Sequence, residues 1–143
     1  LDYPRVYRLA ERLAPFEISI NGGIEKLDAA EAHLRHVAGV MLGRAAYHEP
    51  MLLTGIDTRF FGDVERDSSL DTIMRAMADY AEGELGRGAR LNNITRHMLG
   101  LANGRPGARQ FRQILSVDAA RRGAGPEVLL QALAAVEPQA VAA

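Results

Sequence analysis

The sequence predicts an α/β segment followed by a segment made only of α-helices. Two short apolar runs, residues 16–20 and 37–42, have the composition of β-strands, and a glycine-containing turn follows each of them. The stretch between the two runs has helical spacing, so the predicted order is strand, loop, helix, strand, loop. After about residue 68 the hydrophobic spacing is helical throughout, which predicts a small bundle of four helices.

The first segment is predicted to begin with a helix over residues 3–14, which precedes the first strand. In that strand, Phe16, Ile18 and Ile20 alternate with polar residues, as in a half-buried strand. The second strand, residues 37–42, is almost wholly apolar. We therefore expect it to be buried on both faces.

Asp28 is predicted to cap the helix between the strands, with Glu31 in the capping-box position three residues later. His33 and His36 lie on or near this helix. We interpret both as surface or half-buried side chains and predict no metal site, because no further ligand residues lie nearby. Pro50 fits the first turn of a short helix after the second strand.

The boundary between the two segments is marked by composition. Residues 55–68 combine glycine, serine and six charged side chains, which predicts a linker anchored by Phe60 and Phe61. We accordingly predict domains at residues 1–62 and 63–138, and a frayed tail at 139–143.

Each helix predicted in the second segment has a start or stop signal. Ser68 or Ser69 caps the first helix, and Gly86 and Gly88 end it. The other three helices are predicted over residues 91–103, over residues 106–116 and from Pro126 onward.

The composition of the 143 residues narrows the possible functions. There is no cysteine, which excludes a disulfide, a cysteine-bound metal or a cysteine nucleophile within the chain. No apolar run has the length of a membrane span and no signal peptide is evident, so we expect a cytoplasmic protein. The chain begins with Leu1 in the middle of an α/β pattern, and we expect it to be a fragment. Its serines and carboxylates have no obvious catalytic partners.

Two glycine sites stand at the predicted ends of the strands. Asn21, Gly22 and Gly23 follow the first strand, and Gly43 and Arg44 follow the second. In a (β/α)8 barrel the loops after the last two strands usually hold a phosphate group. Glycine lets backbone N–H groups approach an anion, and arginine adds charged donors. The alternative interpretation is that these glycines only form tight turns.

A basic segment lies in the helical part. Residues 85–117 contain six arginines and no acidic residue, although the whole chain has a net charge of −1. Spacings of four and three residues predict that Arg105, Arg109 and Arg112 share one helix face, and Arg96 and His97 could extend the patch. Such a face is typical of contact with RNA or DNA. The alternative is an ordinary solvated surface.

Four motifs together resemble one known family. They are residues 18–24 (ISINGGI), 39–47 (GVMLGRAAY), 95–101 (TRHMLGL) and 106–112 (PGARQFR). From about residue 3 to residue 136 the chain resembles the tRNA-dihydrouridine synthases, specifically their A-type subfamily. The last two motifs carry the specificity, because many flavin enzymes share glycine-rich barrel ends.

This resemblance implies that the chain holds the last two βα units of an FMN-binding (β/α)8 TIM barrel, followed by a small helical domain that grips tRNA. The residues implied to contact FMN are Asn21, Gly22, Gly23, Gly43 and Arg44. The implied reaction reduces a D-loop uridine, at positions twenty and twenty-a, to dihydrouridine. NADPH reduces the flavin, the flavin passes hydride to the uracil ring, and a cysteine from an earlier barrel loop is the general acid. Without that cysteine the chain should be inactive by itself.

The resemblance also implies that Arg109 and Arg112 contact tRNA, with Arg105, Arg96 and His97 as additional candidates. The target base must leave the RNA fold to reach the flavin, at a cost of a few kcal/mol that a basic domain would help to offset. We expect the complete protein to be a monomer with no obligate protein partner and no membrane contact.

The sequence departs from the subfamily at two positions. Glu49 stands before Pro50 where asparagine is frequent, and Phe111 stands where tryptophan is frequent. Glutamate is a poorer helix cap than asparagine, and phenylalanine buries less area. Two other functions are alternatives: a different FMN- or phosphate-binding TIM-barrel oxidoreductase acting on a small molecule, and a non-catalytic RNA-binding module.

Overall fold

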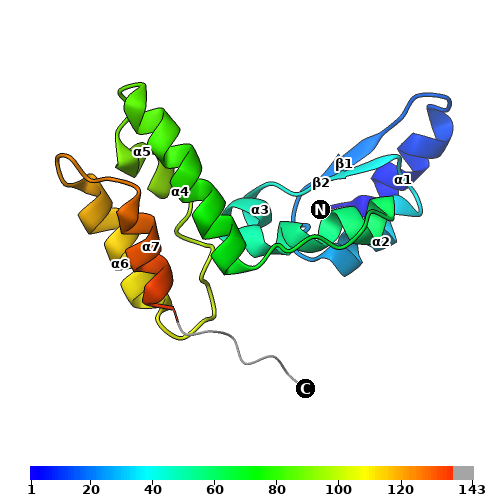
Figure 1. Ribbon diagram of the computed structural model, residues 1–143. Helices are drawn as coiled ribbons and strands as arrows, with labels where there is room; N and C mark the ends of the chain where they lie inside the picture. The colour runs from blue at the N-terminus through cyan, green and yellow to red at the C-terminus, as the bar shows by residue number, and fades with distance from the viewer. Residues whose placement is uncertain (137–143) are drawn as a thin grey trace, which may run out of the picture. The chain divides into compact units, whose positions relative to one another are not determined.

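The computed structural model describes residues 1–136 (Figure 1). The described residues divide into two compact units, Leu1–Glu65 and a second unit that begins at Arg66. The domain boundary expected from the sequence, after residue 62, lies three residues before the boundary in the structure, which follows Glu65. The predicted tail at 139–143 lies outside the described residues. Within the described range, no helix combines the length and the apolar character needed to cross a membrane.

The first unit is built around two parallel strands joined through a helix. Its elements begin with α1 (Tyr3–Arg12), β1 (Ser19–Asn21), α2 (Leu27–Leu34) and β2 (Gly39–Met41). Strands β1 and β2 pair in parallel with Ile20 opposite Val40. A parallel pair requires a crossover, and α2 supplies it. The predicted order of strand, helix and strand is therefore confirmed.

Both strands are shorter than predicted. Phe16 lies outside the ladder with 75% of its surface exposed, and Met41 is 55% exposed although it belongs to β2. The prediction that β2 is buried on both faces is wrong for this chain. The reason is that the sheet has two strands among the described residues, so each strand has one neighbour and the sheet is incompletely covered.

The predicted cap of α2 is also wrong. Lys26 occupies the cap position, without a side-chain hydrogen bond, and Asp28 lies inside the first turn. Asp28 and Glu31 instead form ion pairs with Arg59, whose Nη2 atom lies 2.6 Å from Asp28 Oδ1. These hydrogen bonds raise the pKa of the Arg59 guanidinium. A distant partner thus outcompetes the local capping arrangement.

The segment after β2 is more regular than predicted. It contains α3 (Arg44–His48), the 3₁₀-helix η1 (Pro50–Gly55) and the π-helix η2 (Asp57–Phe61). Pro50 occupies the first turn of η1, as predicted, and Glu49 precedes it without forming a side-chain cap. Phe60 packs against the hydrophobic core of the first unit, whereas Phe61 is exposed. One phenylalanine, not two, therefore anchors the segment.

The core of the first unit lies between the sheet and the two α-helices that precede and connect its strands. Ile20, Ile24, Ala30 and Val37 are buried there, and Tyr3, Val6 and Tyr7 of α1 pack against them. The core therefore holds β1 in place, and with β1 the glycine loop that follows it.

The second unit consists of helices. They are α4 (Leu70–Gly86), α5 (Leu91–Thr95), α6 (Ala108–Val117), the 3₁₀-helix η3 (Asp118–Ala120) and α7 (Glu127–Ala134). Helix α7 contacts both α4 and α6 (Figure 1). The core contains the fully buried side chains of Met74, Leu91, Phe111, Leu115 and Leu129.

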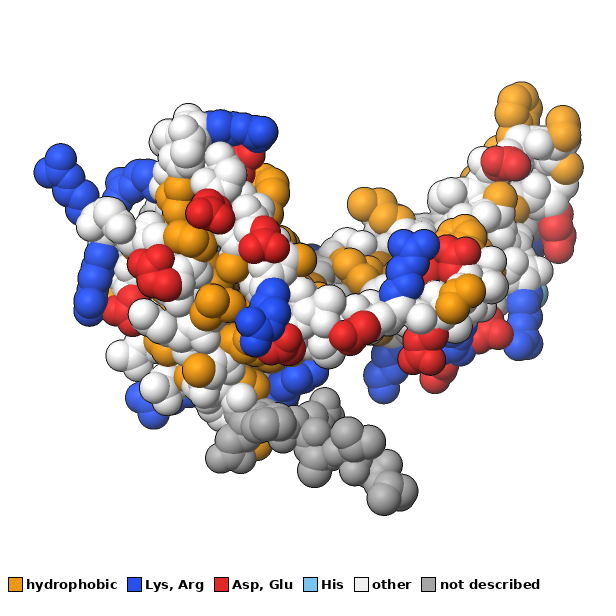
Figure 2. All heavy atoms as spheres, in the orientation of Figure 1, with side chains coloured by type: hydrophobic (Ala, Val, Ile, Leu, Met, Phe, Trp, Pro, Cys, Tyr) orange, Lys and Arg blue, Asp and Glu red, His pale blue; other side chains and the backbone are white. Residues whose placement is uncertain are grey.

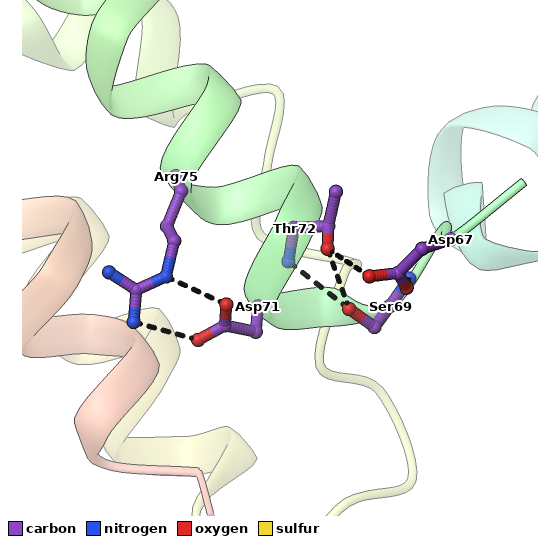
Figure 3. Close-up of polar contacts among 5 residues, drawn as sticks. All are labelled: Asp67, Ser69, Asp71, Thr72 and Arg75. Carbon is purple, nitrogen blue, oxygen red and sulfur yellow. Dashed lines mark hydrogen bonds and ion pairs between the residues drawn. The ribbon is translucent and has the colours of Figure 1, made fainter.

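Ser69, one of the two predicted caps, is the N-cap residue of α4 and directly precedes its first residue, Leu70 (Figure 3). Its hydroxyl accepts a 3.2 Å hydrogen bond from the Thr72 amide. Asp67 in turn accepts hydrogen bonds from the Ser69 amide at 2.9 Å and from the Thr72 hydroxyl at 2.6 Å. These donors lower the pKa of the Asp67 carboxyl. One turn further on, Arg75 forms two hydrogen bonds to Asp71 (Figure 3).

The helix predicted over residues 91–103 is shorter than expected. Helix α5 ends at Thr95, and residues 96–107 form successive turns. Met98 and Leu101 are nevertheless buried, as the hydrophobic spacing indicated. The amide of Leu101 bonds to the carbonyl of Met98, three residues back, and such turns repeat buried side chains at nearly helical spacing. Hydrophobic periodicity alone therefore does not distinguish a continuous α-helix from a series of turns.

Candidate functional site

The two glycine loops lie at the same edge of the sheet. Strands β1 and β2 are parallel neighbours with Asn21 opposite Met41, so the loops that follow them leave from adjacent points. A cavity of about 320 Å³ lies between these loops. Its lining residues are Asn21, Gly22, Gly23, Ile24, Glu25, Met41, Gly43, Arg44 and Ala45. All five residues predicted to hold a phosphate group are among them.

The backbone of the first glycine loop adopts φ angles that residues with a side chain rarely adopt. Gly22 and Gly23 have φ angles of +119° and +64°. A Cβ atom at Gly23 would lie 3.0 Å from the Leu1 side chain and 3.2 Å from the Tyr3 hydroxyl. Glycine is therefore favoured here by the backbone conformation, and a side chain would also crowd the Tyr3 hydroxyl.

Tyr3 of α1 is a residue of this site that sequence reasoning missed. Its hydroxyl donates a 2.8 Å hydrogen bond to the carbonyl of Gly22. Because the peptide unit is planar and trans, the N–H of Gly23 points away from Tyr3. Nothing in the local sequence signals a contact across nineteen residues.

The second loop supplies a positive charge. Gly43 precedes the first residue of α3, Arg44, and a Cβ atom at Gly43 would meet nothing within 4 Å. The Arg44 side chain is exposed and forms no hydrogen bond or ion pair with the residues that the structure describes. Its guanidinium is therefore available to an anion in the cavity. Glu25, also in the lining, carries the opposite charge.

The donors around this cavity suit a phosphate-bearing group. Asn21 contributes an amide, the glycine loop contributes backbone N–H groups, and Arg44 contributes a guanidinium. Met41 and Ile24 contribute apolar side chains to the lining. This combination fits the phosphate end of a nucleotide-like cofactor better than it fits a metal ion. Within residues 1–136 there is no cluster of three histidines or carboxylates that could hold a metal.

Two of the three histidines of the first unit, His33 and His36, contact tyrosines of α1. His33 is 7% exposed, more buried than predicted, and its Nδ1 atom lies 2.6 Å from the Tyr7 hydroxyl. The rings of His36 and Tyr7 stack with centroids 4.3 Å apart. Tyr3 contacts His33 edge-on, so this aromatic cluster lies directly next to the residue that holds the Gly22 carbonyl.

The arginine face predicted in the second unit is only partly helical. Arg109 and Arg112 lie on α6 and are exposed, and the buried residues Ala108, Phe111 and Leu115 anchor this helix as predicted. Arg105 precedes α6 in a turn and is half-buried. The prediction that all three arginines share one helix face is therefore wrong.

Gly107 explains why α6 begins late. Its φ angle is +83°, a conformation that a right-handed helix does not contain. A Cβ atom at Gly107 would lie 1.9 Å from the carbonyl oxygen of Ala135, just after α7. The close approach of these two segments requires a glycine, and the turn it makes separates Arg105 from α6.

The remaining basic candidates lie on the turns before α6. Arg96 Nε donates a 3.0 Å hydrogen bond to His97 Nε2, and both side chains are exposed. Arg112 donates to Asn103 at 3.2 Å, which ties the turn segment to α6. Arg109 has no ion-pair or hydrogen-bond partner among the described residues. The structure thus leaves Arg109 free to contact an external anion.

Comparisons with known proteins give a consistent result. A family model described as dihydrouridine synthase (Dus) matches residues 1–137. A protein of Salmonella typhi named tRNA-dihydrouridine(20/20a) synthase is 51% identical over 133 residues. Proteins of the same name from Escherichia coli (strain K12) and Shewanella oneidensis are 50% and 46% identical, over 133 and 142 residues.

The matches cover the chain more completely than they cover the relatives. The aligned region is 93% of this chain and 40% of the Salmonella protein, 93% and 39% for Escherichia coli, and 99% and 42% for Shewanella. The chain therefore spans about two fifths of the length of the curated relatives that it matches.

Proposed function

The chain belongs to the dihydrouridine synthase family, and from that premise we propose that the protein carrying it reduces uridine in tRNA to dihydrouridine. The observation that carries the proposal is identity of about 50% over 93% of the chain to proteins named tRNA-dihydrouridine(20/20a) synthase. On this proposal the target uridines are those at positions 20 and 20a of the D-loop. The activity is that of the whole protein, since the chain spans 40% of such a relative.

In this proposal the first unit is the end of a (β/α)8 TIM barrel. Parallel strands joined through α2, with the ligand loops at their carboxyl ends, are what the last two βα units of a barrel would supply. The exposure of Met41 on β2 supports a further covering layer in the complete protein. The proposed barrel part covers residues 1–62, and the proposed tRNA-binding part covers residues 63–138.

FMN is the proposed cofactor, held by its phosphate in the cavity between the glycine loops. Asn21, Gly22 and Gly23 would hold the phosphate from one side, and Gly43 and Arg44 from the other. When bound and reduced by NADPH, a flavin supplies the hydride that saturates the uracil ring. The family resemblance implies a cysteine as the donor of the matching proton, and on this proposal that cysteine lies outside this chain, which contains none.

The second unit is the proposed tRNA-binding part. Arg109 and Arg112 would contact the phosphate backbone from α6, and Arg105, Arg96 and His97 would contact it from the turns that precede this helix. An RNA contact of this kind would hold the tRNA in register while the target uridine enters the active site. The absence of acidic residues from 85–117 favours a polyanionic partner.

The test is to incubate unmodified tRNA, transcribed in vitro, with the purified protein carrying this chain and NADPH. Mass spectrometry of RNase fragments should then show a gain of two hydrogen atoms, mapped to D-loop uridines. Flavin absorbance of the purified protein is measured in the same sample. A flavin-containing protein that leaves every uridine unchanged would contradict the proposal and favour a small-molecule oxidoreductase.

A further inference from the structure

A second cavity, of about 450 Å³, lies within the helical unit and contains none of the residues discussed so far as RNA contacts. It is bounded by the end of α4, the start of α5 and the turn after η3. Its lining residues include Leu85, Arg90, Leu91, Ala119, Arg121, Arg122 and Ala124. We call it the Arg90 cavity.

The wall of the Arg90 cavity is apolar. Leu91 and Ala119 are each 2% exposed and belong to the core of the unit, and Leu85 lies beside them at the end of α4. These side chains are held by the helices, so the wall is preformed. A flat, weakly polar group could pack against it without displacing the core.

The rim of the cavity is basic. Arg90, Arg121 and Arg122 line it, and no acidic residue does. Arg121 is paired with Asp118 at 2.9 Å, and Arg90 Nη2 approaches the carbonyl of Ala120 at 3.5 Å. Two of the three guanidinium groups are therefore oriented by the protein, although Asp118 offsets part of the charge.

Arg122 completes the rim as an uncompensated cation. Its side chain is exposed and has no ion-pair or hydrogen-bond partner within the described part of the chain. Figure 2 shows basic side chains gathered at this end of the helical unit, over α5 and the turn after η3. An incoming anion would meet this charge first.

An apolar wall beside guanidinium groups matches one ligand chemistry, that of a nucleotide. A base packs on the wall, guanidinium groups stack on the base or grip its phosphate, and the cavity has the size of an ordinary small-molecule site. An acidic peptide would use the charges but would leave the apolar wall without a partner. We propose that the Arg90 cavity binds one unpaired nucleotide of the RNA substrate, which rests on the proposed function.

The test separates the cavity from the general positive charge of the unit. Ala124→Leu narrows the cavity without changing charge, and Arg122→Ala removes one exposed rim cation. Arg75→Ala is the control for loss of an arginine elsewhere in the unit, since Arg75 is exposed on α4, is paired with Asp71 and does not line the cavity. Each variant of the protein carrying this chain is titrated with unmodified tRNA at several salt concentrations, and its fold is checked by circular dichroism.

The expected result is a loss of tRNA affinity of about tenfold for Ala124→Leu, the size of one lost stacked base. Arg122→Ala should weaken binding and reduce the slope of log affinity against log salt by about 0.7, the value for one single-stranded phosphate. Arg75→Ala should change neither quantity to this extent.

Affinities of Ala124→Leu and Arg122→Ala equal to that of the control would overturn the proposal. If both variants still form dihydrouridine with an unchanged KM for tRNA, this inference fails while the proposed function stands. If the unaltered protein binds tRNA through the cavity but forms no dihydrouridine, the proposed function fails and the RNA site remains.

Discussion

The hydroxyl of Tyr3 donates a 2.8 Å hydrogen bond to the carbonyl of Gly22, and so connects the first helix to the glycine loop that lines the smaller cavity. The Tyr3 ring also contacts His33, with centroids 4.5 Å apart. The loop is therefore held from behind by an aromatic cluster that does not itself line the cavity.

Removing the Tyr3 hydroxyl should loosen the glycine loop without unfolding the first unit. Tyr3→Phe keeps the ring contacts and removes one hydrogen bond, worth about 1 kcal/mol, so FMN affinity should fall roughly fivefold. Flavin fluorescence during titration of the apoprotein measures this. Tyr80→Phe, an exposed position on α4, is the control. Equal FMN affinity in the two variants would show that the bond does not position the loop.

Arg44 should contribute more to FMN affinity than Tyr3 because it would contact the phosphate directly. Arg44→Met removes the guanidinium and should weaken FMN binding by about 10- to 100-fold, the range for hydrogen bonds to a charged group. Affinity for tRNA should be unchanged. Arg35→Met, an exposed position after α2, controls for the loss of charge. The prediction is wrong if both variants retain flavin equally on dialysis.

The glycine site could be predicted from sequence because its geometry follows from local rules. An apolar run, a helix and a second apolar run favour a parallel pair, and a parallel pair brings the two following loops to one edge. Gly22, Gly23, Gly43 and Arg44 therefore had to lie close together once the strands paired. The register of the two strands and their short length could not be predicted from the sequence and were seen only in the structure.

Two of the errors have the same cause, which is a contact from far along the chain. Asp28 does not cap α2 because Arg59 draws it, together with Glu31, into ion pairs. Arg105 is not on α6 because Gly107 must pass close to Ala135. Local propensity describes each segment by itself, so it cannot anticipate a partner that arrives through folding.

The arginines of α6 should bind tRNA without influencing the flavin. The double variant Arg109→Ala with Arg112→Ala should weaken tRNA binding about tenfold and reduce its salt dependence, because two phosphate contacts are lost. The flavin absorbance should be unchanged. Arg66→Ala with Arg75→Ala removes the same charge elsewhere and is the control. Loss of flavin from the first double variant would contradict the division of the protein into two binding parts.

The capping network of α4 should make the second unit sensitive to acid. The Thr72 and Ser69 donors lower the pKa of Asp67 in the folded state, so its contribution to stability is present above the unfolded pKa of about 3.9. That contribution is lost as the pH falls through the folded value. Urea unfolding should show Asp67→Ala destabilised at pH 7 and nearly equal to the unaltered protein at low pH.

Asp79→Ala is the matched control for this pH series, since Asp79 is exposed on the same helix without a hydrogen-bond partner among the described residues. It should leave the free energy of unfolding nearly unchanged throughout. A difference between Asp67→Ala and the unaltered protein that is constant from pH 7 down to pH 2 would show that the carboxylate does not act through its charge.

Gly107 and Gly83 should respond in opposite directions to the same substitution. At Gly107 a Cβ atom would overlap the carbonyl oxygen of Ala135, at 1.9 Å, and the φ angle of +83° is already unfavourable for alanine. Because the blocking atom belongs to the backbone, Gly107→Ala must displace the segment after α7. The expected loss of stability is about 3 kcal/mol, at the upper end of the usual range for single substitutions.

At Gly83, inside α4, a Cβ atom would meet nothing within 4 Å. Gly83→Ala should therefore stabilise the second unit by about 0.5–1 kcal/mol, since alanine restricts the unfolded chain and favours the helix. Thermal unfolding of both variants measures the two effects under one condition. Unchanged stability of Gly107→Ala would contradict the close approach of Gly107 to Ala135, and destabilisation by Gly83→Ala would contradict the open space around Gly83.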